Sequence, residues 1–184
     1  MAQIEFYNLN DEVWVRKQSG ESFQLTERED KMISIVIEHL NNFYPQALKA
    51  LQKEYAGSSL APHYSRFLQV RRFCKCNFGA IDSRPDLTAC GKMNLEEVSC
   101  PLRGECKLEG IVCKPKFDRK ISAGEMRVIE LAYQGLDYLQ IADRLYISEH
   151  TARNHVRNAR LRLGFGSKAE LFAYCAENNL INED

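Results

Sequence analysis

Six of the seven cysteines of this 184-residue protein lie close together in the sequence. Their side chains could do chemistry as a group, because thiolates are soft donors that bind zinc and iron–sulfur clusters. The cluster also coincides with a loss of helical periodicity over about 40 residues, and so long an irregular segment needs an explanation. The six are Cys74, Cys76, Cys90, Cys100, Cys106 and Cys113, separated by one, thirteen, nine, five and six residues.

This cysteine cluster predicts a metal site. The first residues lack the basic and apolar pattern of a signal peptide, so we expect a cytoplasmic protein, where disulfides seldom persist. Four thiolates could hold one zinc ion or a [4Fe–4S] cluster, and both stay open beside free structural or redox thiols. Five cysteines compete for four places, while Cys90 is the least expected ligand. We expect Cys76, Cys100, Cys106 and Cys113 first, with Cys74 next.

A short motif within the cluster bears on the choice of metal. The segment from Cys100 to Cys106 has Cys-Pro followed by a second Cys five residues later. It resembles part of the iron–sulfur motifs of WhiB-like regulators and of DNA glycosylases of the endonuclease-III family. Val98 occupies the position where those families have a further Cys. The resemblance implies neither fold, and no glycosylase residue can be placed.

A second set of residues lies on a predicted amphipathic helix over 148–163. Three arginines recur at helical spacing opposite an apolar stripe, with two asparagines beside them. Arginine can bind guanine edges and asparagine adenine edges in the major groove, while further arginines neutralise phosphates. The formal charge is +4 over 148–168, although the whole chain is neutral. The alternative is a solvated charged face. The polar residues are Arg153, Asn154, Arg157, Asn158 and Arg160.

The short helix before this one and the turn between them give a helix-turn-helix arrangement. Residues 121–181 resemble the LuxR/GerE-type helix-turn-helix domain of bacterial response regulators and quorum sensors. The matching positions run through the whole segment without gaps. They are Ile121, Ser122, Glu125, Val128, Leu131, Gly135, Ile141, Ala142, Leu145, Ile147, Ser148, Thr151, Asn154, His155, Leu163, Gly164, Ser167, Lys168, Glu170 and Leu171.

The resemblance implies that the third helix of the domain enters the major groove of double-stranded DNA. Carried over by position, Arg153, Asn154 and Arg157 become the candidates for contacts to bases or phosphates. Thr151 and Lys168 match positions that touch phosphates in the family. The fourth helix often mediates dimerisation there, so we expect a homodimer on DNA.

The elements expected to position these residues are mainly helical. Loose alternation over 1–25 predicts two or three short strands, and a capping-box pattern at Thr26 predicts a helix that starts there. Two more helices follow, the second from Pro62 to about Phe73. Capping residues mark four helices in the C-terminal part. The expected parts are an N-terminal helical domain (1–73), a Cys-rich metal-binding segment (74–115), a linker (116–120) and a four-helix LuxR-type domain (121–184).

Together these patterns predict a sequence-specific DNA-binding transcription regulator with a thiolate metal site. No apolar run could span a membrane, and no Ser/His/Asp set, phosphate loop or spaced carboxylate pair predicts an enzyme. For the N-terminal part, sensing, dimerisation and contact with RNA polymerase stay open. Two alternatives remain: a redox- or metal-sensing iron–sulfur regulator, and a sigma-like adaptor that binds protein.

Overall fold

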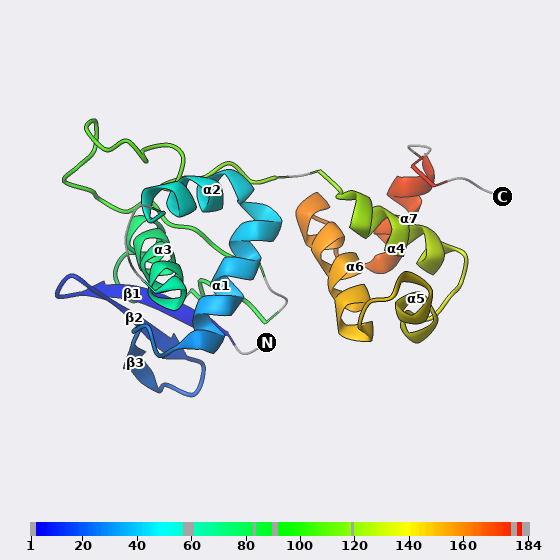
Figure 1. Cartoon of the computed structure of the whole chain (residues 1–184), viewed down its shortest axis with the longest axis horizontal. Coiled ribbons are helices and arrows are strands. Elements are labelled where there is room, and N and C mark those ends of the chain that lie inside the picture. The colour runs from blue at the N-terminus through cyan, green and yellow to red at the C-terminus, as the bar shows by residue number, and fades with distance from the viewer. Residues whose placement is uncertain are drawn as a thin grey trace. The chain divides into compact units, whose positions relative to one another are not determined.

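The computed structural model of the protein describes residues 3–56, 61–82, 84–89, 92–118, 120–177 and 180–181. The chain divides into two compact units, Met1–Phe117 and Asp118–Asp184. The described residues contain seven helices and one three-stranded sheet, which confirms the predicted mainly helical fold (Figure 1). None of the helices within the described ranges is long and apolar enough to cross a membrane.

The first unit begins with a small antiparallel sheet, which confirms the predicted strands. Its strands are β1 (Ile4–Leu9), β2 (Glu12–Lys17) and β3 (Ser22–Gln24), paired in that order. Phe6 lies opposite Val15 in the register, and both side chains are buried. Because side chains alternate across a strand, this register directs one face of the sheet into the core.

A two-residue turn joins the first two strands. Asn10 and Asp11 have φ angles of +50° and +65°, in the left-handed region that asparagine and aspartate tolerate. Such a turn follows the natural twist of a hairpin. It brings Asp11 and Glu12 to the tip of the hairpin, where they contact Lys75 and Arg71.

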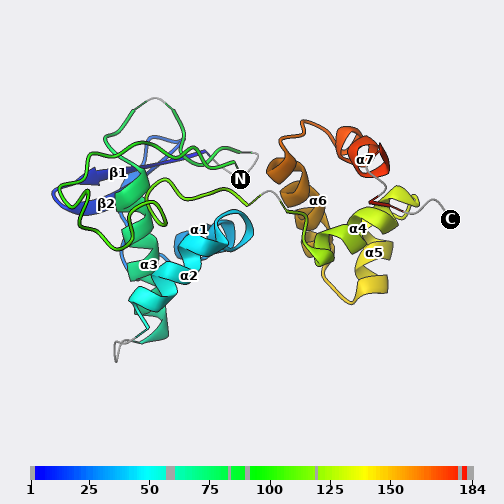
Figure 2. The same ribbon diagram turned by 90° about the horizontal axis from the view of Figure 1, so that it is seen from above.

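Three helices follow: α1 (Asp30–Phe43), α2 (Pro45–Glu54) and α3 (Pro62–Asn77) (Figures 1 and 2). The predicted start at Thr26 is wrong. The backbone N–H of Glu29 donates to the carbonyl of Thr26 at 3.2 Å, which closes a separate turn. The helix therefore begins only after this turn, and no side chain caps it.

Helix α3 is longer than predicted, and this changes the position of two cysteines. It continues past Phe73 to Asn77, so Cys74 and Cys76 lie in its last turn and not in an irregular segment. Successive residues of a helix are rotated by about 100°, so positions two apart point to nearly opposite sides. Cys74 is accordingly fully buried, whereas Cys76 is half-buried.

The core of the first unit forms between the sheet and these helices. Phe6 stacks on Phe78 with ring centroids 5.1 Å apart, and Phe73 meets Phe78 edge-on at 6.1 Å. Such aromatic contacts add to the free energy gained by burying the rings. The other fully buried large side chains of this unit include Leu25, Ile33, Leu40, Leu51 and Leu87.

The segment after α3 packs onto the same core. Leu87 exchanges two backbone hydrogen bonds of 2.9 Å with Ile4 and so lies beside β1. Phe117 stacks on Phe43 with ring centroids 5.5 Å apart. The Cys-rich segment therefore belongs to the first compact unit, and Phe117, inside the expected linker over 116–120, also contacts this unit.

Buried Asp86 should make the stability of the first unit depend on pH. Its carboxylate accepts a 2.6 Å hydrogen bond from the Phe6 N–H. Burial raises the pKa of Asp86 from 3.8 to about 8, against the lowering effect of this bond. Between these values the folded protein holds a proton that the unfolded chain has lost, so stability falls as pH rises.

The variant Asp86→Asn keeps an acceptor for the Phe6 N–H but has no proton to lose. We therefore expect its unfolding free energy, relative to that of wild type, to rise by about 2 kcal/mol as the pH goes from 5.5 to 8.5. Urea unfolding followed by the fluorescence of Trp14, the single tryptophan of the chain, measures this. The exposed Asp30→Asn on α1 is the control and should change little with pH. Parallel pH profiles for wild type and Asp86→Asn would contradict the assignment.

The second unit has four helices: α4 (Ala123–Tyr133), α5 (Tyr138–Leu145), α6 (Glu149–Leu163) and α7 (Lys168–Glu177). The four predicted starts and the predicted ends of the first three helices are confirmed, because the predicted caps form. Side chains that accept from a backbone N–H within the first turn cap the first three, and a residue with positive φ follows α4, α5 and α6. The capping residues are Ser122, Asp137 and Ser148, and the residues with positive φ are Gly135, Tyr146 and Gly164.

Candidate functional site

Helices α5 and α6 form the helix-turn-helix of the second unit. The turn between them bonds back to α5, because the Ile147 N–H donates to the Ala142 carbonyl at 3.0 Å. Tyr146 ends α5 in the left-handed conformation and is 96% exposed. Helix α6 packs on α4 and α5 through Ala152, Val156 and other apolar residues, which leaves its remaining faces for polar side chains.

Arg153 is the most exposed of the predicted DNA-contacting arginines. Its Nε atom donates to Glu149 Oε1 at 3.1 Å, and its guanidinium lies 4.7 Å from the ring centroid of Tyr138. The Nζ atom of Lys168 lies 5.2 Å from the ring centroid of Tyr138 and 4.9 Å from that of Phe172. Both cations thus lie near the Tyr138 ring, and cation–π attraction to this ring holds the two side chains there.

Thr151 and Asn154 occupy the first turns of α6. The Thr151 hydroxyl lies 2.7 Å from the hydroxyl of the capping residue Ser148. Asn154 Nδ2 lies 3.0 Å from His150 Nε2. Both side chains are partly exposed, so they remain accessible at the N-terminal end of the helix.

The three polar residues toward the C-terminal end of α6 differ in exposure. Arg157 and Arg160 are half-buried, and the Nε atom of each has no hydrogen-bond partner among the described residues. Asn158 is only 5% exposed, and its Oδ1 accepts from Arg157 Nη2 at 3.5 Å. Asn158 precedes buried Arg162 by four residues and so shares the helix face that packs inward. The structure therefore does not present Asn158 beside the exposed polar residues.

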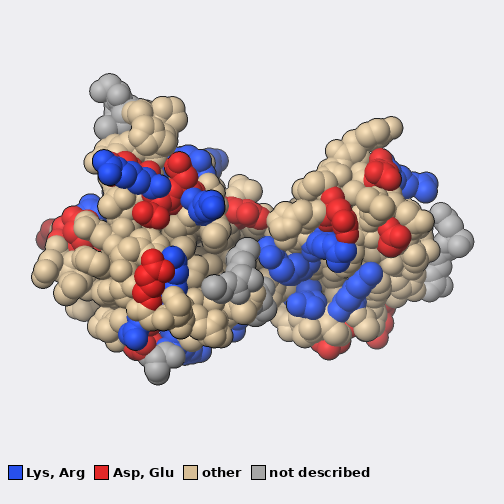
Figure 3. Space-filling model, turned by 90° about the horizontal axis from the view of Figure 1, so that it is seen from below, with Lys and Arg blue, Asp and Glu red and all other residues tan. Residues whose placement is uncertain are grey.

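Basic side chains gather on one face of the second unit, as Figure 3 shows. On α6, Arg153, Arg157 and Arg160 share one side of the helix, because they recur at spacings of four and three residues. Opposite charge is present at the start of the helix, where Glu149 pairs with Arg153. The face as a whole remains positive and can attract a polyanion.

A buried ion pair in this unit was not predicted from the sequence. Arg162 Nη1 contacts Glu125 Oε2, and the two side chains are only 5% and 3% exposed. Glu125 also closes the capping box of α4 by accepting from the Ser122 N–H at 2.8 Å. The pair thus joins α6 to the start of α4. The capping-box pattern identified Glu125, but nothing in the sequence pointed to its distant partner.

The first unit holds a second candidate site, a cavity of about 790 Å³ beside the C-terminal end of α3. Four cysteines line it, each half-buried: Cys76, Cys100, Cys106 and Cys113. Cys74 does not line this cavity, and Cys175 belongs to the other unit. Cys90 lies outside the described residues. The cavity thus brings together the four cysteines that the sequence analysis placed first.

Asn77 attaches the last of these cysteines to α3. Its side chain is fully buried, and Nδ2 donates to the carbonyls of Phe73 and Val112, both at 2.9 Å. Oδ1 accepts from the backbone N–H of Lys114 at 3.2 Å. The two residues that flank Cys113 are therefore bonded to the residue that follows Cys76.

The other two cysteines lie in a chain of tight turns. The Arg103 N–H donates to the Cys100 carbonyl at 3.2 Å, and the Glu109 N–H donates to the Cys106 carbonyl at 2.9 Å. Glu96 holds the start of this region, because its Oε2 accepts from the Gly79 N–H at 2.7 Å. These bonds give the segment a fixed path even though it forms no helix or strand.

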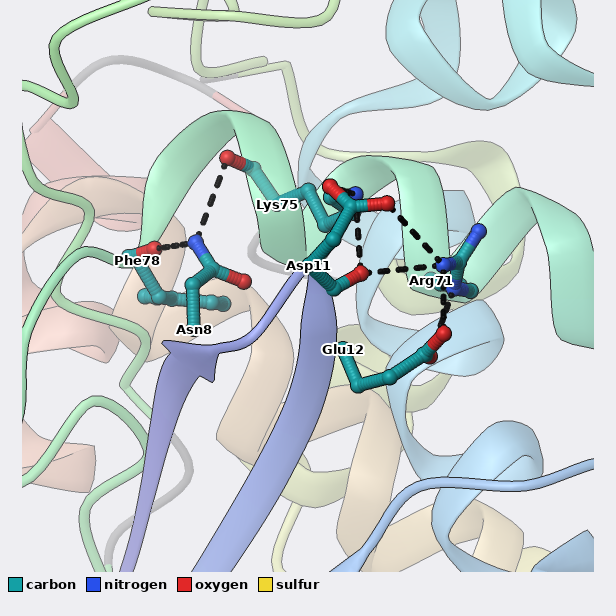
Figure 4. A network of polar contacts seen from close by, with 6 residues as sticks. All are labelled: Asn8, Asp11, Glu12, Arg71, Lys75 and Phe78. Carbon is teal, nitrogen blue, oxygen red and sulfur yellow. Dashed lines mark hydrogen bonds and ion pairs between the residues drawn. The ribbon is translucent and has the colours of Figure 1, made fainter.

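A network at the hairpin tip holds α3 in place (Figure 4). Arg71 donates to both carboxylate oxygens of Glu12, at 3.0 and 3.2 Å, and Lys75 contacts the carboxylate of Asp11. Asn8 Nδ2 donates to the carbonyl of Phe78 at 2.5 Å. The end of α3 that carries Cys76 is therefore fixed to β1 and β2.

The thiols influence one another and a nearby cation. Burial raises the pKa of the Cys76 thiol, the Arg72 guanidinium opposes this, and the sulfurs of the other three cysteines raise the pKa further. Arg72 Nη2 donates to Cys106 Sγ at 3.4 Å. Burial also raises the pKa of Cys74 well above its usual range. As placed, no three His, Cys, Asp or Glu side chains of the described ranges converge on one metal ion.

Comparison with known proteins bears on the second unit. Residues 119–175 match the family model described as bacterial regulatory proteins, luxR family. The match covers α4, α5 and α6 and most of α7. No curated protein matched the chain, and no solved structure did.

Proposed function

We propose that this protein, whose C-terminal unit is a LuxR-type helix-turn-helix domain, is a transcription regulator that binds specific sites in double-stranded DNA. The observation that carries the proposal is the basic face of α6 on a helix-turn-helix unit that matches this family. A helix of this kind fits the major groove of B-DNA. Such a protein would act in the cytoplasm by binding, not by catalysis.

The exposed end of α6 supplies the proposed base contacts. Arg153, Asn154 and Arg157 are the candidates for base edges, since arginine and asparagine recognise guanine and adenine with paired hydrogen bonds. Thr151 and Lys168 would bind phosphates at the edge of the groove, and Arg160 would add a further phosphate contact. We leave the buried Asn158 out of this set.

Two further partners complete the proposal. A second copy of the chain would give a dimer on DNA, so that two α6 helices enter successive major grooves about 34–36 Å apart. RNA polymerase is the proposed partner of a DNA-bound activator, and the N-terminal unit offers the surface for it. That unit would also hold a thiolate metal site, structural or sensory, at the cavity lined by four cysteines.

The test begins with selection of bound sequences from a random pool of DNA duplexes by the full-length protein. On the selected duplex, we expect Arg153→Ala and Arg157→Ala each to weaken binding by about 10- to 100-fold, because one bidentate contact contributes about 1–3 kcal/mol. Where the arginine that is removed contacts a phosphate, the slope of log affinity against log salt concentration should also fall by about one unit. Fluorescence anisotropy at several salt concentrations measures both.

Two further variants sharpen the test. Arg16→Ala removes the same charge from an exposed position on β2 and should leave affinity unchanged. Glu149→Gln should strengthen binding severalfold, because it releases Arg153 and removes a negative charge near the phosphates. If Arg153→Ala, Arg157→Ala and Glu149→Gln all bind DNA like the wild type, a sigma-like adaptor that binds protein through α6 becomes the better explanation.

A further inference from the structure

We propose that Cys76, Cys100, Cys106 and Cys113 are the four ligands of a [4Fe–4S] cluster in the cavity at the end of α3. The proposal specifies the thiolate site of the proposed function and rests on that part of it alone, not on DNA binding. It assigns both the inorganic group and the residues that bind it.

The shared cavity is the first argument. Four separate positions of the chain place a cysteine on the wall of one space of about 790 Å³, and all four side chains are half-buried. They come from the last turn of α3 and from the turns over 100–113. Independent thiols would have no reason to meet in this way, whereas a cluster of four irons takes one thiolate at each iron.

Helix geometry explains why Cys76 belongs to this set and Cys74 does not. The two residues are rotated by about 200° from each other around α3. The Cys74 side chain therefore enters the apolar core, with no exposed surface, while Cys76 faces the cavity. A buried cysteine in such a place acts as a small apolar residue. The pair in the Cys-x-Cys motif thus supplies one ligand only.

The size of the cavity favours a cluster over a single ion. Thiolates around zinc lie about 3.8 Å apart, as follows from four bonds of about 2.3 Å in a tetrahedron. The four cysteines instead line a cavity of about 790 Å³, which is far more space than one ion fills. A cubane of four irons and four sulfides is larger and binds thiolates that stand farther apart.

The charges around the cavity suit an anionic group. Four thiolates and a cluster carry a net negative charge, and Arg72 already donates to Cys106 Sγ at 3.4 Å. The acidic side chains nearby have partners: Asp11 contacts Lys75, Glu97 pairs with Lys114 at 2.5 Å, and Glu96 accepts from the Gly79 N–H. Arg72, which pairs with none of these carboxylates, is therefore available to the sulfurs, and Arg103 also lines the cavity. Hydrogen bonds to cluster sulfurs are known to set the reduction potential.

Binding of the cluster deprotonates the four cysteines. Each of the four thiols loses its proton as its sulfur forms a bond to iron, and the proton passes to solvent. Two ferrous ions, two ferric ions and four sulfides make up the [4Fe–4S]2+ cluster, so its assembly from these components transfers no net electrons and needs no oxidant. The cluster would then join the end of α3 to the turns over 100–113 by four covalent links.

The first experiment is analysis of full-length protein after anaerobic purification and reconstitution with equal amounts of ferrous and ferric iron and with sulfide. We expect about four irons and four acid-labile sulfides per chain, and a broad visible absorption band that dithionite bleaches. Protein without iron after reconstitution would overturn the proposal. About one zinc per chain that reconstitution does not replace would overturn it as well, in favour of a structural zinc site.

Variants then test the choice of ligands. We expect Cys76→Ser, Cys100→Ser, Cys106→Ser and Cys113→Ser each to lose at least about three quarters of the iron. Cys74→Ala and Cys175→Ala are the matched controls and should keep it. Arg72→Met should keep the iron but move the reduction potential to a more negative value. Equal loss from Cys74→Ala in a folded protein would overturn the assignment, and circular dichroism checks folding.

Iron and sulfide are measured without DNA, so this test stands apart from the test of DNA binding. Arg153→Ala should lower DNA affinity and leave the iron content unchanged. Protein that holds a cluster but binds no duplex would refute the proposed function alone. Protein that binds duplex but holds no cluster would refute this inference alone.

Discussion

Arg162→Met is expected to lower the unfolding free energy of the C-terminal unit by about 3–5 kcal/mol. The substitution leaves the Glu125 carboxylate, 3% exposed, without the cation that it contacts. Removing one partner of a buried ion pair is costly, because the other charge stays desolvated and uncompensated. A loss of this size is a large part of the stability of a domain of this length, so the unit should be largely unfolded at moderate temperature.

The two units can be followed separately in the full-length protein. Trp14 fluorescence reports the first unit only, whereas circular dichroism reports the helices of both. Arg162→Met should shift the helical transition of the C-terminal unit in urea and leave the Trp14 transition in place. Arg127→Met, at an exposed position on α4, is the control and should change stability by less than about 0.5 kcal/mol.

The double variant Glu125→Gln/Arg162→Met separates the lost charge from the lost side chain. Glutamine keeps the oxygen that caps α4 but carries no charge, so the double variant should recover part of the stability lost by Arg162→Met alone. A helical transition unchanged by Arg162→Met would contradict the buried ion pair. The absence of any recovery in the double variant would show that packing of the Arg162 side chain, not its charge, stabilises the contact.

The helices of the C-terminal unit could be predicted from the sequence because local signals mark their ends. Ser122, Asp137 and Ser148 each cap a helix as predicted, since a capping side chain acts within one turn of its own position. Thr26 carries the same kind of signal, yet its segment forms a turn before α1. A capping-box pattern permits a helix to start, but at Thr26 the backbone hydrogen bond from the Glu29 N–H closes a turn instead.

The end of α3 could not be predicted, because its last turn depends on distant residues. Nothing within the sequence of 73–77 marks a continued helix. Asn77 is held by Val112 and Lys114, and Lys75 is held by Asp11 across more than sixty positions. Arg162 and Glu125 illustrate the same limit in the other unit, since their contact spans 37 positions. Residue types and spacing already placed the four cysteines of the cavity ahead of Cys74, and the fold supplies the reason, because the Cys74 side chain is buried in the core.

Asn77→Ala is expected to lower the unfolding free energy of the first unit by about 3 kcal/mol. Its side chain makes three hydrogen bonds in a fully buried position, to Phe73, Val112 and Lys114. Alanine leaves the Val112 carbonyl and the Lys114 N–H without their partner, and an unpaired buried polar group costs about 1–3 kcal/mol. The Trp14 transition in urea measures the loss, and the helical signal of the C-terminal unit should not move.

Asn77→Asp tests whether hydrogen bonds or volume cause this loss. Aspartate has the same shape but presents oxygen where Asn77 Nδ2 donates to two carbonyls, so it should destabilise at least as much as alanine. A milder effect of Asn77→Asp would contradict the hydrogen-bond assignment. The same bonds flank Cys113, so a bound cluster would hold that segment even without Asn77. Each variant should therefore be more stable in reconstituted protein than in iron-free protein, because a group that binds only the folded state stabilises it by mass action.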